Sequence, residues 1–192
     1  MKIHIEPHNP DWIVEFAKSK EDLQQILKDI PIISIEHVGS TSVPGLIAKP
    51  VLDIAIIVTG ASLPLACTAI ENASYTPLGE IGIEDRFAFR QPGFKKGQQA
   101  NGVGVEGAEM RRNTYVTVDG CLSLRNQMDV KRILLEDRAL RDEYAGVKRE
   151  LVEKGVGSVD EYCRGKTGCI LRILKRAGWG NEDLDEVRTA NL

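Results

Sequence analysis

Residues 32–58 read IISIEHVGSTSVPGLIAKPVLDIAIIV, two apolar runs joined by a loop. The first run, residues 32–38, is rich in β-branched side chains and predicts a strand. The second, residues 51–58, is almost continuously apolar, as expected of a strand covered on both faces of its sheet. Residues 39–50 contain two glycines, two prolines and three hydroxyl side chains, so we expect a shaped connection that includes a helical turn.

The neighbouring segments predict helices and further strands around this pair. Residues 10–30 place apolar side chains on one helical face, and residues 62–73 do the same over a shorter length. Residues 86–90, RFAFR, alternate so that both phenylalanines share one strand face and both arginines the other, and residues 115–118 alternate likewise. The core is therefore expected to be a mixed sheet.

The second half of the chain predicts a long loop and then helices. Residues 92–113 are rich in glycine and show no period, which indicates a mobile loop or insertion. From residue 123 onward the apolar spacing becomes helical and predicts three helices. We expect one α/β (α+β) domain over residues 1–180, a mixed sheet flanked by helices with C-terminal helices, followed by a frayed tail over residues 181–192.

Composition points to a cytoplasmic protein that binds a small molecule. A net charge of -3, with no block of like charge, predicts no general attraction to nucleic acid or to anionic lipid. No apolar run approaches the roughly 20 residues needed to span a bilayer, and the opening residues MKIHIE lack the apolar core of a secretion signal. Composition does not define the oligomeric state.

The loop after the first predicted strand has the chemistry of an anion site. Gly39 lets the backbone approach a phosphate closely, and the hydroxyl groups of Ser40, Thr41 and Ser42 add donors at a helix start. Asp53 is a carboxylate in an apolar strand, where a cation offsets the cost of its burial. Mg²⁺ is the natural cation, because it binds carboxylate and phosphate oxygens together.

Each of these residues also has a structural explanation. The hydroxyl groups can simply cap the turn, and His37 at the strand end can hydrogen-bond the backbone. Asp53 can instead form an ion pair with Lys49 or Arg86.

Two further motifs are set aside. Residues 102–107 spell G-x-G-x-x-G, but no strand precedes them. Residues 165–167, GKT, resemble the end of a phosphate-binding P-loop, but Asp160 replaces its first glycine and the triplet lies in a helical pattern.

Residues 35–54, IEHVGSTSVPGLIAKPVLDI, resemble the signature of the GrpB family, and the resemblance extends over residues 7–177 apart from the glycine-rich loop. That family is similar to the nucleotidyltransferases, which place a Gly-Ser turn and a strand with metal-binding acids side by side. Active nucleotidyltransferases pair two acids on that strand with one residue between them, and here the partner position is Ala55. Residues 113–126 resemble the next block of the family, with Tyr115 where a histidine is expected.

The resemblance implies a Mg²⁺-dependent nucleotidyltransferase-like protein that binds a nucleoside triphosphate or another small phosphate ligand. Asp53 is the expected metal ligand and, with His37, the expected catalytic residue. Phosphate contacts are expected from Gly39, Ser40, Thr41, Ser42, Lys49, Arg86 and Tyr115. Ala55 and Tyr115 favour two alternatives, a non-catalytic nucleotide- or partner-binding module, or a different group transferase that uses the same pocket.

Overall fold

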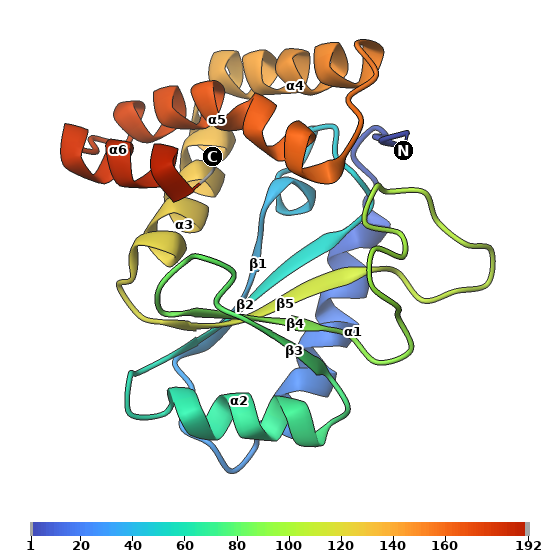
Figure 1. Ribbon diagram of the computed structural model, residues 1–192, viewed down its shortest axis with the longest axis vertical. Coiled ribbons are helices and arrows are strands. Elements are labelled where there is room, and N and C mark those ends of the chain that lie inside the picture. Colours follow the sequence, from blue (N-terminus) through green and yellow to red (C-terminus); the bar gives the residue numbers. More distant parts are fainter. Residues whose placement is uncertain (1, 191–192) are drawn as a thin grey trace.

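The computed structural model describes residues 2–190, and its centre is a five-stranded mixed sheet (Figure 1). The strand order is β1-β2-β5-β4-β3. β2 runs parallel to β5, and all other neighbours are antiparallel. The strands are β1 (Ser34–Val38), β2 (Leu52–Val58), β3 (Thr76–Gly79), β4 (Arg86–Arg90) and β5 (Arg112–Val118). The mixed α/β architecture expected from the sequence is confirmed.

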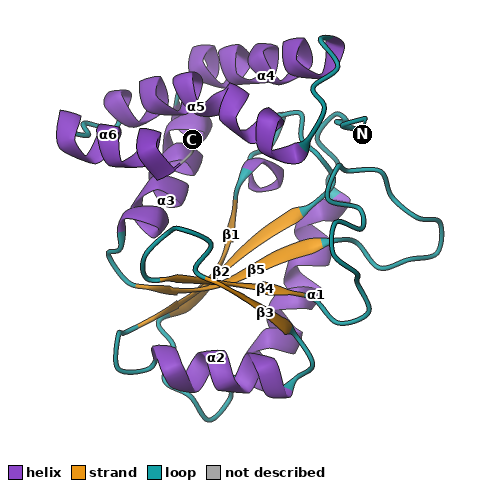
Figure 2. Cartoon of the chain, in the orientation of Figure 1, coloured by secondary structure: helices purple, strands orange, loops and turns teal. Residues whose placement is uncertain are grey.

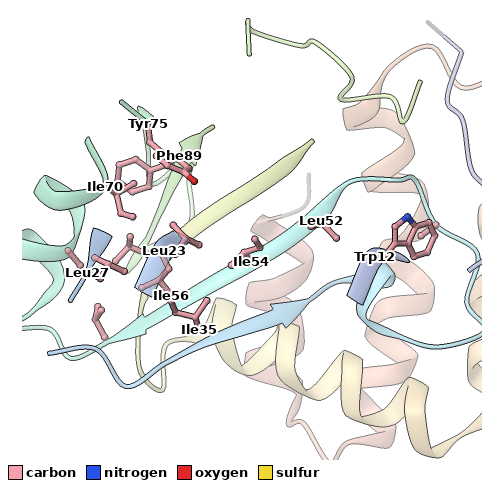
Figure 3. Close-up of a cluster of buried hydrophobic side chains, with 14 residues drawn as sticks. Trp12, Leu23, Leu27, Ile35, Leu52, Ile54, Ile56, Ile70, Tyr75 and Phe89 are labelled. Atoms are coloured by element: carbon pink, nitrogen blue, oxygen red, sulfur yellow. The ribbon is translucent and has the colours of Figure 1, made fainter. Parts of the chain in front are cut away.

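Two helices, α1 (Asp11–Ile26) and α2 (Leu63–Asn72), cover one face of this sheet (Figure 2). The largest apolar cluster lies here, and it includes Leu23 of α1, Ile70 of α2 and Ile56 of β2 (Figure 3). Phe89 of β4 belongs to the same cluster and Phe87 packs against it, which confirms the predicted alternation of residues 86–90. We call this side of the sheet the apolar face.

The C-terminal helices lie on the other side of the sheet (Figure 1). They are α3 (Leu122–Glu136), α4 (Arg138–Glu153), α5 (Val159–Arg176) and α6 (Asn181–Ala190). Val43 and Leu46 of the β1–β2 loop are fully buried in a cluster with Ile133 of α3 and Ile173 of α5. These helices therefore hold the β1–β2 loop in place from above the sheet.

The expected helical turn in the β1–β2 loop is a 3₁₀ turn, η1 (Ser40–Ser42). It is only three residues long, so it has no helix dipole of the kind expected to bind phosphate. Gly39 precedes it with φ +70° and ψ −172°, a backbone conformation essentially restricted to glycine.

Two elements differ from the sequence predictions. β3 was not predicted, because this exposed edge strand of four residues has no alternating apolar pattern. The predicted frayed tail is wrong for Asn181–Ala190, which form α6 because Leu184 and Val187 pack against Leu174 and Trp179. Residues 191–192 of that tail lie outside the described residues.

The glycine-rich segment between β4 and β5 forms no helix or strand, as predicted. It is nevertheless attached to the rest of the molecule, because Lys49 Nζ donates to the Ala100 carbonyl (3.0 Å) and the His4 amide donates to the Asn101 carbonyl (2.8 Å). Its mobility stays a prediction. Within the described part of the chain, no helix has the length and apolarity needed to cross a membrane.

Candidate functional site

The site begins with the alternation of side chains along β2. Leu52, Ile54 and Ile56 point into the apolar face, so Asp53 and Ala55 point to the opposite side. Asp53 lies directly across from Asn113 of the parallel strand β5, and Asn113 Nδ2 donates to Asp53 Oδ1 at 2.9 Å. The sheet register therefore places a carboxylate and a carboxamide together on the side that faces the C-terminal helices.

Gly39 allows the β1–β2 loop to pass close to this carboxylate. A Cβ atom at position 39 would collide with Asp53 Oδ2. Glycine is thus required here twice, for its backbone conformation and for the space that it leaves. The loop backbone at residue 39 therefore packs directly against the Asp53 side chain.

A cavity of about 370 Å³ opens above these residues. Its lining comes from the β1–β2 loop, from strands β2, β4 and β5, and from helices α4 and α5. The charged residues of the lining are Lys49, Arg86, Lys148 and Lys166, against the carboxylates Asp53 and Asp160. The polar remainder is Ser40, Thr41, Asn113, Tyr115, Tyr162 and Cys163. Basic side chains outnumber acidic ones in this lining, an arrangement that favours an anion over a cation.

Lys148 is the most deeply buried of these basic side chains. It is 1% exposed, and its Nζ donates to Ser40 Oγ at 2.7 Å and to the Ile47 carbonyl at 2.9 Å. Burial lowers the pKa of Lys148 well below its ordinary value, and the positive charge of Lys166 lowers it further. Burial, followed by the charge of Lys166, also lowers the pKa of Lys49.

Asp53 is held without a salt bridge among the described residues, since its only hydrogen bond comes from Asn113. Burial raises its pKa, and this effect exceeds the opposing influence of the Asn113 hydrogen bond and of Lys49. The structural ion pair of Asp53 with Lys49 or Arg86, left open by the sequence, does not form.

Arg86 and Tyr115 form the side of the cavity on β4 and β5. The Arg86 guanidinium lies over the Tyr115 ring, 4.9 Å from its centroid, and its Nε is buried without a hydrogen-bond partner. An unpaired buried N–H group is costly, so this arginine is suited to receive an anionic acceptor.

Six of the residues predicted for the site line the cavity: Ser40, Thr41, Lys49, Asp53, Arg86 and Tyr115. Gly39 lies against Asp53, as described above. The structure does not bring Ser42 to the cavity lining, and its hydroxyl donates to the Gly39 carbonyl at 2.6 Å, closing the 3₁₀ turn. The Thr41 hydroxyl also has partners within the protein, His37 at 2.9 Å and the Val51 carbonyl at 3.5 Å.

His37, expected beside Asp53, points the other way. It follows Ile35 by two residues on β1, so its side chain lies on the apolar face, where its ring stacks on Phe16 of α1 at 4.7 Å. Burial lowers the pKa of His37 to about 4, and Lys131 and His8 contribute. His37 therefore does not join Asp53, with which it was expected to be catalytic, because the two-residue period of the strand sends its side chain to the opposite face.

Sequence reasoning missed Lys148 and Lys166 as site residues. Lys148 lies one turn after Tyr144 in α4, and Lys166 lies one turn after Tyr162 in α5, so both lysines occupy the buried side of an amphipathic helix. A lysine on the apolar stripe of a helix was the available signal. Residues 165–167 are no P-loop, as expected, since they lie inside α5.

The lining offers limited support for a metal ion. No group of three or more His, Cys, Asp or Glu side chains in the described residues could hold one. Ala55 shares the face of Asp53 and supplies no ligand. Mg²⁺ can be held by one carboxylate when substrate phosphates and water complete its shell, and Asp53 Oδ2 faces Gly39 without a protein hydrogen bond.

Comparison with known proteins identifies the family to which this chain belongs. The model of the family described as GrpB protein matches residues 2–176, and the chain belongs to that family. A UPF0157 protein of Streptomyces coelicolor is 33% identical over 182 residues, which cover 93% of this chain and 86% of the relative. The crystal structure of the GrpB protein from Enterococcus faecalis superposes with a TM-score of 0.72 at 24% identity, covering 92% of this chain and all of that one. A complex of Cid1 with its short product ApU is a far weaker match, with a TM-score of 0.45 and 14% identity over 86% of this chain and 48% of that one.

Proposed function

We propose that the cavity binds the phosphate groups of a nucleoside triphosphate and that the protein is a nucleotidyltransferase-like enzyme. The observation that carries this proposal is the set of three cations, Lys49, Arg86 and Lys166, that line a 370 Å³ cavity together with Asp53. Lys49, Lys166 and Arg86 come from three different segments of the chain, so they can surround a chain of phosphates from several sides. The charge developing on phosphate oxygens during transfer is stabilised by such fixed cations.

Asp53 is proposed as the protein ligand of the Mg²⁺ ion that accompanies the triphosphate. Its Oδ1 is oriented by Asn113, which leaves Oδ2 for the ion. The metal supplies charge neutralisation on the phosphates. Tyr115 and the Ser40 hydroxyl are proposed to contact phosphate oxygens, while Gly39 keeps the loop close enough for this.

Binding without transfer is a second candidate, and Ala55 favours it. In a two-metal transfer site, a second acid on this strand holds the other ion. Ala55 lies next to Tyr115 on the neighbouring strand, and the second carboxylate of the lining is Asp160 of α5. A module that binds the nucleotide for regulation would keep the cations and would have no use for the second acid.

Titration calorimetry with ATP, GTP, CTP and UTP, each with and without MgCl₂, tests the binding step. The proposal expects saturable binding that Mg²⁺ strengthens, and the cavity variant Lys166→Met should weaken it. Release of pyrophosphate in the presence of candidate hydroxyl and amine acceptors then separates the two candidates. Absence of binding for all four nucleotides contradicts both the transferase and the binding module. Binding without release of pyrophosphate contradicts the transferase and supports the non-catalytic binding module.

A further inference from the structure

The pair formed by Ser40 and Lys148 has the geometry of an activated nucleophile. Ser40 and Lys148 both line the cavity, and Lys148 Nζ lies 2.7 Å from Ser40 Oγ. The second partner of Nζ is the Ile47 carbonyl at 2.9 Å, which can only accept a hydrogen bond. A neutral amine can therefore donate to Ile47 and still accept the proton of Ser40 with its lone pair.

The surroundings of Lys148 favour that neutral amine. The side chain is 1% exposed, and removal from water penalises the charged form of an amine. It forms no salt bridge among the described residues, and two further lysines, Lys49 and Lys166, share its cavity. Burial and like charge both disfavour the ammonium form, which agrees with the lowered pKa.

We propose that Ser40 is a catalytic nucleophile for phosphorus electrophiles and that Lys148 is its general base. The identity of the electrophile rests on the proposed function, which supplies a nucleoside triphosphate. Ser40 Oγ attacks the α-phosphorus of that nucleotide. The Oγ–P bond forms, the bond from the α-phosphorus to the bridging oxygen breaks, and pyrophosphate leaves. The hydroxyl proton passes to Lys148 Nζ, which becomes an ammonium ion.

A covalent intermediate accounts for how a site with Ala55 could support transfer. An acceptor hydroxyl or amine displaces Oγ from phosphorus. The Lys148 ammonium returns its proton to Ser40 Oγ and becomes a neutral amine again, while the proton of the acceptor is released to water. Lys49, Lys166 and Arg86 neutralise the pyrophosphate in the first step, so that no second carboxylate on β2 is required.

A fluorophosphonate probe tests the nucleophile independently of any nucleotide, because it modifies activated serines by the same bond exchange and releases fluoride. Peptide mass spectrometry of the wild-type protein should place the label on Ser40. Ser40→Ala should remove it, whereas Ser42→Ala, which deletes a hydroxyl from the same turn outside the cavity lining, should leave the rate unchanged. Lys148→Arg retains hydrogen-bond donors towards the Ile47 carbonyl, but its guanidinium stays protonated and cannot accept the proton of Ser40, so it should slow labelling by about 100-fold.

A wild-type protein in which Ser40 stays unlabelled while the fold is intact overturns the proposal, even if the Lys148 variant fails to fold. Equal labelling rates of the wild type and a folded Lys148→Arg variant contradict the role of Lys148 as the base. Lys148 would then have only the structural role of linking Ser40 to Ile47 by hydrogen bonds. Incubation with each of the four nucleoside triphosphates and MgCl₂ identifies the electrophile through a nucleotidyl adduct on Ser40. Bound nucleotide without this adduct overturns the nucleotidyl step, whereas failure of binding, measured separately, counts against the proposed function alone.

Discussion

The two faces of the sheet use the same strands for opposite purposes. On the apolar face, Ile54 and Ile56 are fully buried under α1 and α2, and His37 is buried there with its ring on Phe16. On the other face, Asp53 and Tyr115 open into a cavity rich in cations. A strand alternates its side chains, so β2 supplies core and site residues at consecutive positions. The comparison teaches that neighbours in sequence here belong to separate environments and that their substitution should affect different properties.

Asp53→Asn should have the largest effect, on the site face. The change should abolish Mg²⁺-dependent binding of a nucleoside triphosphate, because the amide removes the charge that the metal needs. Stability without metal should be unchanged or slightly higher. The raised pKa of Asp53 means that the native state holds the proton more tightly, so its ionisation costs stability as pH rises from the ordinary value of 3.8 through the raised one. Thermal melts with and without MgCl₂ and ATP check both parts, and a large loss of stability in the metal-free variant would contradict the assignment of Asp53.

His37→Gln should show the opposite pattern, on the apolar face. The pKa of His37 is lowered from 6.5 to about 4, so the unfolded chain binds the proton first and the native protein loses stability as pH falls from 6.5 towards 4. The loss amounts to at most about 3 kcal/mol. Urea unfolding of both proteins across this range should show that the variant lacks this component, while ATP binding at neutral pH changes little. Loss of binding in a stable variant would restore a functional role for His37.

Gly39→Ala should reduce both the stability of the fold and the affinity for nucleotide, because Gly39 lies where the β1–β2 loop meets Asp53. Backbone strain alone should destabilise the protein by about 1–3 kcal/mol, and the added Cβ displaces the carboxylate and weakens nucleotide binding. Gly45→Ala is the matched control, because Gly45 also has a positive φ, +78°, but nothing lies within 4 Å of its added Cβ. Denaturation and binding should show strain in both variants and loss of affinity only in Gly39→Ala.

Arg86→Met should have the smallest of these effects, about a tenfold loss of nucleotide affinity. Arg90→Met is its control, because Arg90 projects from the same strand on the same side but does not line the cavity. Calorimetry should detect the loss only for Arg86. Equal losses for the two arginines would indicate a general field of positive charge instead of contact with the ligand.

Patterns within single elements predicted much of the fold and part of the site. The alternation RFAFR placed both phenylalanines in the core and Arg86 at the cavity, and the apolar run around Asp53 marked it as unusual. The edge strand β3 and helix α6 were missed, because β3 is short and exposed and α6 depends on contacts with Trp179. The helix start expected at Ser40 is a short turn, and the positive charge of the site comes instead from lysines distant in sequence.

The sequence by itself determined the mixed sheet, the isolated acid in β2 and the family of the protein. These depend on local periodicity and on residue types at fixed spacing, which folding does not alter. Only the tertiary structure decided that His37 turns away from Asp53 and that Lys148, 108 residues after Ser40, lies in contact with it. The physical reason is that strand register and helix packing determine which faces of the strands and helices contact one another. Both depend on the burial of apolar side chains across the whole chain.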